Sequence, residues 1–416
     1  MLKGKNVILG VTGGIAAYKI VGLASALVKQ GASVNVLMTE AATHFITQDT
    51  FEAITKNKAI VDTFDRNFEY EVEHIALAKK ADIFMVAPAT ANTIAKLAHG
   101  IADNMLTTTF LACTCPKMVA PAMNTEMYNN EVTQENMDKL ESMGVTVIPA
   151  DSGRLACGDT GIGKMPEPEL LLAYIEKEIA REKDMEGMHV LVTAGATKEP
   201  LDPVRFITNH STGKMGFAIA KECMLRGAKV VLCKAATSST PPEFVDIIDT
   251  HTSAEMFEAC KRYARGADFI IKAAAVSDYR PAEVAENKMK KKDGELSINL
   301  ERTVDILKYL GEHKSPSQVI CGFSMETENL IENSTAKLHK KNADLIVANN
   351  LKDSGAGFGT DTNLVTFITK EGYKSLELLS KADVARQIVD KLLEISSAKN
   401  DGMSLGELYF VLSHID

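Results

Sequence analysis

A strand, a glycine turn, a helix and a second strand follow one another at the start of this 416-residue chain, and this pattern constrains the fold most. Apolar residues 7–11 predict a buried strand, and Gly13-Gly14 predicts a turn. Residues 15–30 have the apolar periodicity of a helix, and a second strand is predicted at 34–38 after Gly31. The segment is therefore a βαβ unit, in which the two strands are parallel.

The same pattern starts again near residue 190. Residues 190–193 predict a strand, a long polar loop follows, and residues 216–226 predict a helix that ends at Gly227. Another strand is predicted at 230–233. Two βαβ units so far apart predict an α/β protein with two Rossmann-like three-layer domains.

Three further buried strands begin after an Ala-Asp pair and end in polar residues; the pairs start at Ala81, Ala267 and Ala343. Ligands of open α/β sheets bind beyond the carboxyl ends of the strands, so the segments after these strands should carry the sites. The charged stretch 181–187 lacks a core pattern and marks a boundary. We predict domains at 1–186 and 187–396, followed by a tail of unknown role at 397–416.

Composition excludes several classes of protein. The chain has 46 Lys and Arg against 55 Asp and Glu, a net charge of −9, which argues against nucleic-acid binding by phosphate neutralisation. No apolar stretch approaches the roughly 20 residues that span a bilayer. The seven cysteines are odd in number and include no CxxC pair, which indicates reduced thiols. We expect a cytoplasmic protein that binds neither nucleic acid nor membrane.

The loop Thr12-Gly13-Gly14 can present backbone N–H groups to a phosphate at the start of a helix. A glycine turn without a ligand is an equally common interpretation. The loop lacks the dinucleotide fingerprint GxGxxG, although Glu40 beyond the second strand resembles its ribose-binding acid. A dehydrogenase built from two NAD-type Rossmann domains is therefore an alternative, weakened because neither half contains the fingerprint.

Four polar segments accompany the predicted strands of the first half. They are Gly13-Gly-Ile-Ala-Ala-Tyr-Lys19, Pro88-Ala-Thr-Ala-Asn-Thr93, Pro121-Ala-Met-Asn-Thr-Glu-Met-Tyr128 and the segment Asp151–Gly161 around Cys157. Together they resemble the homo-oligomeric flavin-containing cysteine decarboxylases. The resemblance implies a flavodoxin-like flavin decarboxylase domain. It also implies that FMN binds at Gly13, Gly14, Ile15, Thr39, Thr90, Ala91 and Asn92.

Decarboxylation of a cysteinyl group needs an electron sink, because direct loss of CO2 would leave an unstabilised carbanion. Oxidation of the CH2–SH group to a thioaldehyde creates that sink, and FMN can carry it out. By the resemblance, His74 is the base of the oxidation, Asn124 binds the substrate carboxylate and Cys157 donates the proton of the final reduction. Glycines on both sides of Cys157 permit a flap.

Each of these three residues also has an ordinary structural interpretation. A lone histidine such as His74 at a helix start is more often a capping or surface residue. Asn124 could be a turn residue, and Cys157 could be one more small buried apolar group. A flavoprotein subunit that has lost its catalytic residues is a second alternative, which the presence of all three residues argues against.

The second half contains a long polar loop that runs from residue 193 to Gly216 through Arg205 and Asn209. Loops of this length inside a domain are usually functional. Residues 211–213 precede a helix and can bind an anion. The lysine-rich segment 287–292 would normally be solvated surface, but an acidic protein that handles a triphosphate must concentrate positive charge locally.

These segments, with Ala273-Ala-Ala-Val-Ser-Asp-Tyr-Arg-Pro281, Gly322-Phe323 and Ala348-Asn-Asn350, resemble the phosphopantothenate-cysteine ligase domain. With the flavin domain, the combination resembles the bifunctional phosphopantothenoylcysteine decarboxylase/phosphopantothenate-cysteine ligases of coenzyme A biosynthesis. The resemblance covers about residues 4–395 and implies a Rossmann-like ligase domain. Two departures are Ala196, where proline is commonest, and Thr303-Val304, where Asn-Pro is usual.

The resemblance implies that CTP with Mg2+ converts 4′-phosphopantothenate to an acyl-cytidylate, which the amine of cysteine then attacks. Lys288 would assist formation of the cytidylate, and Asn209 and Arg205 would bind the acyl part. The positions that match CTP contacts are Ala273, Ala274, Asp278, Val304, Asp305, Ile306, Leu307, Phe323, Lys337 and Lys341. The metal ligands are unknown, and Mg2+ is expected to be held mainly by the CTP phosphates.

The family also implies a homo-oligomer. Its flavin domains assemble as trimers or as dodecamers built from trimers, and its ligase domains form dimers. The expected substrates are 4′-phosphopantothenate, cysteine and CTP, and the expected product after decarboxylation is 4′-phosphopantetheine.

Overall fold

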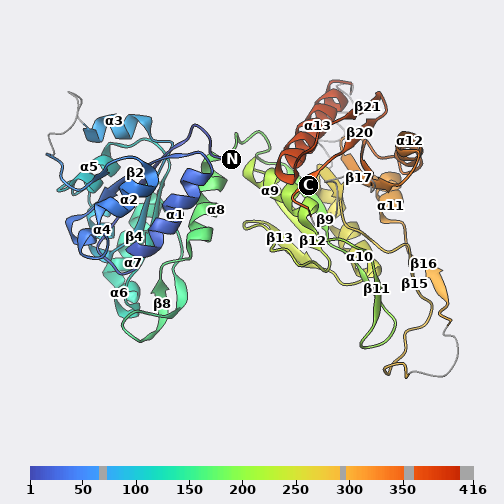
Figure 1. The fold of residues 1–416 in the computed structure, drawn as a ribbon, viewed down its shortest axis with the longest axis horizontal. Helices are drawn as coiled ribbons and strands as arrows, with labels where there is room; N and C mark the ends of the chain where they lie inside the picture. The colour runs from blue at the N-terminus through green and yellow to red at the C-terminus, as the bar shows by residue number, and fades with distance from the viewer. Residues whose placement is uncertain (65–72, 291–296, 351–359, 403–416) are drawn as a thin grey trace. The chain divides into compact units, whose positions relative to one another are not determined.

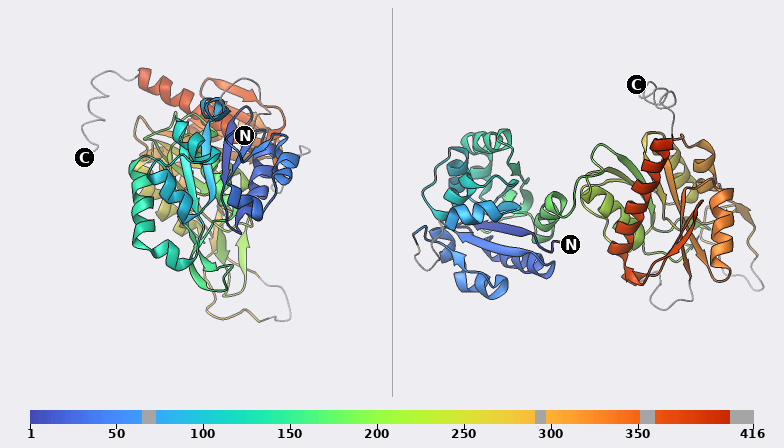
Figure 2. Two further views of the ribbon diagram at one scale, coloured as in Figure 1. Left: turned by 90° about the vertical axis from the view of Figure 1, so that its left-hand side faces the viewer. Right: turned by 90° about the horizontal axis from the view of Figure 1, so that it is seen from above.

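The computed structural model describes residues 1–64, 73–290, 297–350 and 360–402 (Figures 1 and 2). It divides into two compact units, Met1–Arg181 and Glu182–Asp416. The predictions for Lys291 and Lys292, and for the tail beyond Gly402, lie outside the described residues. Within these ranges no helix is both long enough and apolar enough to cross a lipid bilayer.

The first unit is built on a parallel sheet with the strand order β3-β2-β1-β4-β5-β6. The strands are β1 Asn6–Val11, β2 Ser33–Met38, β3 Ala59–Ile60, β4 Ile83–Ala89, β5 Lys117–Pro121 and β6 Thr146–Val147. All seven residues of β4 are buried, as expected for a parallel strand with helices on both faces. The doubly wound α/β class is confirmed, and within it the first sheet has the Rossmann order rather than the flavodoxin order 2-1-3-4-5.

The helices of the first unit are α1 Ala17–Lys29, α2 Gln48–Thr55, α3 Glu73–Lys80, α4 Ala91–Ala98, α5 Met105–Ala112, α6 Thr125–Asn129, α7 Glu131–Ser142 and α8 Pro168–Ile179. Helices α4, α5 and α7 share one apolar core with β1, β4 and β5. Helix α1 packs with α2 and α8. An antiparallel hairpin, β7 Asp151–Arg154 and β8 Thr160–Lys164, lies beside α6 (Figure 1).

The second unit has an eight-stranded sheet with the order β13-β12-β9-β14-β17-β18-β20-β21. The strands are β9 His189–Ala194, β12 Lys229–Lys234, β13 Asp246–Asp249, β14 Phe269–Lys272, β17 Val319–Glu326, β18 Leu345–Asn350, β20 Thr366–Thr369 and β21 Gly372–Ser375. The first six are parallel and repeat the order of the first unit, whereas β20 and β21 add an antiparallel edge. The predicted second βαβ start is therefore confirmed.

Helices cover both faces of this second sheet. They are α9 Lys214–Leu225, α10 Ser253–Tyr263, α11 Ile306–His313, α12 Leu330–Lys340 and α13 Lys381–Gly402. Helices α10, α11 and α12 share a core with the sheet, and α9 packs against α13. Two short ribbons project from the sheet as an arm (Figure 1), namely β10 Lys198–Pro200 with β11 Phe206–Thr208 and β15 Tyr279–Pro281 with β16 Leu300–Arg302. A fourth ribbon pairs β19 Thr362–Asn363 with β22 Leu379–Ser380.

The domain boundary predicted after residue 186 falls inside the second unit, which begins at Glu182. Arg226, only 8% exposed, forms ion pairs with Asp184 and with Asp390 of α13. The backbone N–H of Met185 also donates to the carbonyl of Arg226 at 3.0 Å. The charged stretch therefore packs on the second unit, because the carboxylate of Asp184 neutralises the buried guanidinium of Arg226, which is distant in sequence.

We predict that the second domain ends at residue 396, and helix α13 runs past this position to Gly402. Lys399 Nζ lies 2.9 Å from Asp344 Oδ1 and 2.6 Å from the carbonyl oxygen of Gln318. Lys314 Nζ reaches the other Asp344 oxygen at 2.8 Å. Asp344, 5% exposed, thus binds the last turns of α13 to the base of the sheet.

Replacing Asp344 by asparagine should destabilise the second unit by about 3 kcal/mol near pH 7, because two lysines lose a buried counter-ion. Burial alone raises the pKa of Asp344, but the hydrogen bonds from Lys314, Lys399 and the Ile320 N–H outweigh it and leave the pKa lowered. The carboxylate therefore stabilises the fold above the ordinary carboxyl pKa of about 4, and this contribution is lost as the pH falls through the lowered value.

Urea unfolding of wild type and Asp344→Asn at several pH values measures the difference, which should be full at pH 7 and shrink in acid. The control is Glu394→Gln, which removes only an exposed pair with Lys391 on α13 and should cost less than about 0.5 kcal/mol. Equal stability of Asp344→Asn and wild type at pH 7 would contradict the anchoring role.

Candidate active sites

The buried hydroxyl of Thr12 joins the two loops at the centre of the first sheet. Thr12 directly follows β1, and its Oγ1 donates to the carbonyl oxygen of Pro88 at 2.7 Å. The same Oγ1 accepts from the backbone N–H of Thr90 at 3.1 Å. Because β1 and β4 are neighbours, this contact lies where the chain order reverses, the usual ligand position in open α/β sheets.

The start of α1 has the features of a phosphate site. A Cβ on Gly13 would lie 2.5 Å from Ala41 Cβ, so the chain passes too closely there for any other residue. A Cβ on Gly14 would meet only Thr90 Cγ2, at 4.0 Å, so space is open above it. Helix α1 begins without a side-chain cap, and the positive end of its dipole suits an anion. These residues fit a phosphate-bearing cofactor such as FMN.

The other residues predicted to bind FMN lie at the same edge of the sheet. Thr39 follows β2 and caps the 3-10 helix Glu40–His44. Thr90 caps α4 by accepting from the N–H of Thr93, so Ala91 and Asn92 lie in the first turn of that helix. Ile15, 56% exposed, precedes α1. The seven predicted residues thus gather where β1, β2 and β4 end.

Asn124 and Cys157 are brought together by the hairpin β7–β8. Asn124 Nδ2 lies 3.6 Å from Cys157 Sγ, and its Oδ1 accepts from the backbone N–H of Glu126 at 2.8 Å as the cap of α6. Asp159, which sequence reasoning missed, completes the group. Its Oδ2 accepts from the Cys157 thiol at 3.3 Å and from Asn124 Nδ2 at 3.5 Å. The only sequence signal was its position two residues after the cysteine.

Two glycines allow the hairpin to dock on the loop that carries Asn124. The backbone N–H of Met123 donates to the carbonyl oxygen of Gly163 at 3.0 Å, and Thr125 Oγ1 donates to that of Ile162 at 2.8 Å. A Cβ on Gly161 would overlap Thr125 Oγ1, and one on Gly163 would overlap the carbonyl oxygen of Met123. The close approach therefore sets the position of Cys157.

His74 does not meet Asn124 or Cys157 in the described chain. It lies half-buried in the first turn of α3, which packs against α5. Figure 1 shows α3 and β8 at opposite ends of the first unit. One copy of the chain therefore does not assemble the three predicted catalytic residues of this half.

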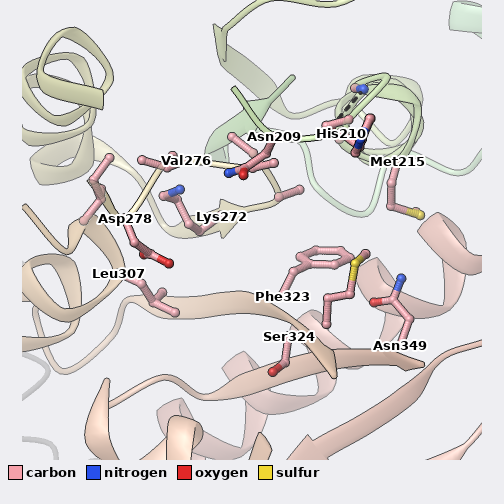
Figure 3. Close-up of a pocket in the computed structure, with 18 of the residues that line it drawn as sticks. Asn209, His210, Met215, Lys272, Val276, Asp278, Leu307, Phe323, Ser324 and Asn349 are labelled. Atoms are coloured by element: carbon pink, nitrogen blue, oxygen red, sulfur yellow. Dashed lines mark hydrogen bonds between the residues drawn. The ribbon is translucent and has the colours of Figure 1, made fainter. Parts of the chain in front are cut away.

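The second unit repeats the threonine contact at its own centre. Thr193 is buried in β9, and its Oγ1 accepts from the backbone N–H of Ala274 after β14, at 3.1 Å. A cavity of about 680 Å³ lies beyond these strand ends (Figure 3). The predicted residues that line it are Asn209, Ala273, Ala274, Asp278, Val304, Asp305, Ile306, Leu307, Phe323, Lys337 and Lys341.

The cavity is lined by more positive than negative side chains. Its lysines are Lys214, Lys272, Lys337, Lys341 and Lys381, against the carboxylates of Asp278 and Asp305. Sequence reasoning missed Lys272, Lys214 and Lys381, because a lysine at a strand or helix end is ordinarily solvated. Helix α9 begins beside the cavity at Gly213, whose φ is +74°, without a side-chain cap. The excess of lysines and this helix start favour a polyanionic ligand.

Asp305 links two elements of the cavity wall. Its Oδ1 accepts from the backbone N–H of Lys308 at 3.0 Å and caps α11, which positions Ile306 and Leu307. Its other oxygen pairs with Lys341. Burial opposes ionisation, but these hydrogen bonds leave the pKa of Asp305 lowered. Burial also lowers the pKa of Lys337, whose Nζ donates to the carbonyl oxygen of Phe323 at 2.8 Å.

Arg205 and Lys288 are exposed on the arm and are not among the residues that line the cavity. Asp202, which sequence reasoning did not single out, positions both. Its buried carboxylate accepts from the backbone N–H groups of Val204, Arg205 and Met289, at 2.7, 2.8 and 3.1 Å. These hydrogen bonds lower the pKa of Asp202 against the opposing effect of burial.

Both departures from the family pattern have a structural role. The backbone N–H of Ala196, which a proline would lack, donates to the carbonyl oxygen of Ala236 at 3.0 Å. Thr303 Oγ1 donates to the carbonyl oxygen of Ser277 at 2.6 Å, and its N–H donates to that of Asp278 at 3.0 Å. The Thr303-Val304 loop is therefore held against the wall that carries Asp278.

Two family models together match almost the whole described chain. One described as "Flavoprotein" matches residues 1–180, and one described as "DNA/pantothenate metabolism flavoprotein C-terminal domain" matches residues 185–395. The fold and these matches define a two-domain enzyme with a flavoprotein half and a pantothenate-metabolism half.

Similar full-length proteins make the assignment specific. The coenzyme A biosynthesis bifunctional protein CoaBC of Bacillus subtilis (strain 168) is 46% identical over 400 residues, 95% of this chain and 98% of that protein. The CoaBC protein of Haemophilus influenzae (strain ATCC 51907 / DSM 11121 / KW20 / Rd) is 41% identical over 393 residues, 94% of this chain and 98% of that protein. A crystal structure of the C-terminal domain of a CoaBC protein is 41% identical and covers 53% of this chain and 100% of that one, with a TM-score of 0.45.

The chain belongs to the CoaBC family of bifunctional coenzyme A biosynthesis proteins. The family predicted from the motifs is confirmed, and with it the assignment as an enzyme that combines a decarboxylase flavoprotein domain with a ligase domain. The dehydrogenase alternative is excluded.

Substituting Gly161 by alanine should displace the hairpin from Thr125, because the new methyl group would occupy the position of its hydroxyl. We expect hydrogen exchange of the β7–β8 amides to accelerate at least several-fold while β1 and β4 remain protected. The matched control is Gly153→Ala in the same hairpin, where a Cβ would lie 3.6 Å from Lys164 Cδ, an ordinary contact. Equal protection of the hairpin in both variants would contradict the docking argument.

Proposed function

We propose that this chain converts 4′-phosphopantothenate, cysteine and CTP to 4′-phosphopantetheine, by ligation in the second unit and decarboxylation in the first. The observation that carries the proposal is the lysine-lined cavity, because it suits a triphosphate and contains all ten predicted CTP positions and Asn209. We place the reaction in the cytoplasm, which agrees with seven cysteines that are all free thiols.

The ligation needs an activated acid, because a carboxylate and an amine do not form an amide directly at neutral pH. A carboxylate oxygen of phosphopantothenate attacks the α-phosphorus of CTP, pyrophosphate leaves, and an acyl-cytidylate forms. The cysteine amine then attacks the acyl carbon and releases CMP. The cavity lysines stabilise charge on the phosphates, and Asn209 binds the acyl part.

Mg2+ would be carried mainly by the phosphates of CTP. Among the residues that the structure describes, no three His, Cys, Asp or Glu side chains form a group able to hold a metal ion. The lysines and the phosphate-bound ion would then share the neutralisation of the triphosphate.

In the decarboxylation, FMN held at the ends of β1, β2 and β4 supplies, when bound, the two-electron exchange that makes the cysteinyl carbon an electron sink. His74 accepts a proton from the substrate. The amide of Asn124 donates to the substrate carboxylate, a role supported by its donation to the carboxylate of Asp159. The thiol of Cys157 delivers the final proton to carbon, and Asp159 orients that thiol.

A homo-oligomer would complete the decarboxylase site. Helix α3, with His74, and the hairpin, with Cys157, are at opposite ends of the first unit (Figure 1). A site that needs both residues therefore requires two copies of the chain. This supports the trimer, or the dodecamer built from trimers, that the family implies.

A dimer would complete the ligase site. The arm exposes the apolar side chains of Val204, Phe206, Tyr279 and Leu300, each at least 45% exposed, which suits burial against a second copy. The same arm carries Arg205 and Lys288 outside the cavity of their own chain. Docking of two arms would bring both charges into the ligase sites, where Lys288 assists cytidylate formation.

The activity is tested by mass spectrometry of one reaction that contains the protein, FMN, phosphopantothenate, cysteine, Mg2+ and CTP, beside a second reaction without CTP. We expect 4′-phosphopantetheine in the first reaction only. If phosphopantothenoylcysteine accumulates instead, the flavin half is a binding subunit without catalysis. If nothing forms with CTP, the proposal is wrong.

The substitution Cys157→Ser should still release CO2 but stop at the oxidised enethiol, because the serine hydroxyl is a far weaker acid than the thiol. The measurement is the product mass, which should be two hydrogens lighter than phosphopantetheine. The control is Cys115→Ser, a partly buried cysteine of the same unit outside the site, which should yield the normal product. Normal product from Cys157→Ser at the wild-type rate would refute the role of Cys157 as proton donor.

A further inference from the structure

Lys272 is the last residue of β14, in the middle of the second sheet. It pairs in register with Thr193 of β9 and with Gly322 of β17. Its side chain is only 8% exposed, and it lines the cavity on the same wall as Asp278 (Figure 3). Lys272 is therefore almost completely shielded from bulk water, although it faces a cavity in which a ligand could bind.

The four other lysines of the cavity are each held by a protein atom. Lys214 pairs with Asp361 at 2.7 Å, and Lys341 pairs with Asp305. Lys337 donates to the carbonyl oxygen of Phe323 at 2.8 Å, and Lys381 donates to that of Thr360 at 2.5 Å. In the part of the chain that the structure describes, Lys272 alone among the five makes no hydrogen bond or ion pair.

The groups around Lys272 do not replace a partner. They are the Cys260 thiol on α10, Lys337 on α12, Asp305 at the start of α11 and Asp278 after β14. Asp305 already pairs with Lys341, and Lys337 repels a second positive charge. Burial, the largest effect, lowers the pKa of Lys272 to about 8. A buried ammonium without a partner costs free energy, which a bound anion would recover.

We infer that Lys272 is a nucleotide-binding residue whose ammonium group pairs with a phosphate oxygen of the nucleoside triphosphate. The inference rests on the proposed function of this cavity. An anionic oxygen could also come from the carboxylate of the acyl substrate. The nucleotide is favoured because Lys272 directly precedes Ala273 and Ala274 and lies beside Asp278, Asp305 and Lys337, all predicted nucleotide positions.

Proton uptake distinguishes this role from a purely structural one. Near pH 8 about half of the Lys272 side chains would be neutral before the nucleotide binds. A phosphate beside the amine favours the charged form and raises its pKa, so binding takes up a proton. Uptake should approach half a proton at pH 8 and vanish near pH 6.5, where Lys272 is already charged. Lys337, whose pKa is also lowered, can add to the uptake, so the comparison is made between variants.

The experiment is isothermal titration of the full-length protein with CTP at pH 8 in two buffers of different ionisation enthalpy. Lys272→Met should bind CTP about 10- to 100-fold more weakly, the value of a charged hydrogen bond, and take up less of a proton than wild type. Lys272→Arg, which is always charged, should retain most of the affinity but lose the same share of proton uptake.

The control is Lys234→Met. Lys234 ends the neighbouring strand β12, but it pairs with Asp249 at 2.6 Å and does not line the cavity. This variant should keep both the affinity and the proton uptake. A parallel titration with phosphopantothenate alone should be unchanged in Lys272→Met.

The possible results distinguish a failure of this inference from a failure of the proposed function on which it rests. If wild type does not bind CTP, the proposed function of the cavity fails. If wild type binds CTP and Lys272→Met matches it in affinity and proton uptake, the inference is wrong and the function stands. Weaker binding of phosphopantothenate with unchanged CTP binding would assign Lys272 to the acyl substrate and also overturn the inference. If Lys272→Met does not fold, the proton uptake of Lys272→Arg decides.

Discussion

The same kind of hydrogen bond occurs once in each unit, where it fixes the loops of that unit's candidate site. A buried threonine at the end of the first strand accepts a backbone N–H from the loop after the fourth strand, Thr12 from Thr90 and Thr193 from Ala274, each at 3.1 Å. After these two neighbouring parallel strands, the chain leaves toward opposite faces of the sheet. The backbone N–H groups that follow the strands therefore move apart and cannot hydrogen-bond to the neighbouring strand. The hydroxyl replaces the missing acceptor. The loops that would bind FMN and CTP therefore start from a defined position.

Binding of a triphosphate also requires positive charge, although the protein as a whole is acidic. The net charge of −9 leaves a triphosphate without general attraction, so the cavity must supply it locally. Pairing Lys214, Lys337, Lys341 and Lys381 with protein oxygens orients them before a ligand arrives and limits the cost of burying them. Lys272 is different, since its charge is balanced only when an anion binds.

Residues proposed to act on substrates lie outside the two sheets and depend on small, specific anchors. Cys157 is positioned by a hairpin that needs glycine at 161 and 163, and Arg205 and Lys288 are positioned through the buried carboxylate of Asp202. Neither anchor has a recognisable sequence pattern. A glycine needed for a close approach looks like any loop glycine, and a buried aspartate looks like a surface one until its three N–H donors are known.

The sequence by itself determined the two α/β units, the polar strand ends and the family, because buried parallel strands and motif loops are local patterns that need no knowledge of distant contacts. Ten predicted CTP positions and Asn209 line one cavity for the same reason, since the carboxyl ends of parallel strands meet at one edge. Only the tertiary structure placed the start of the second unit at Glu182 and showed that α13 continues to Gly402. It also brought Asp159 into contact with Cys157 and separated His74, Arg205 and Lys288 from the remaining site residues. It also decided the burial of Lys272. These features depend on which charges and glycines meet across long stretches of chain, and no local pattern encodes such pairings.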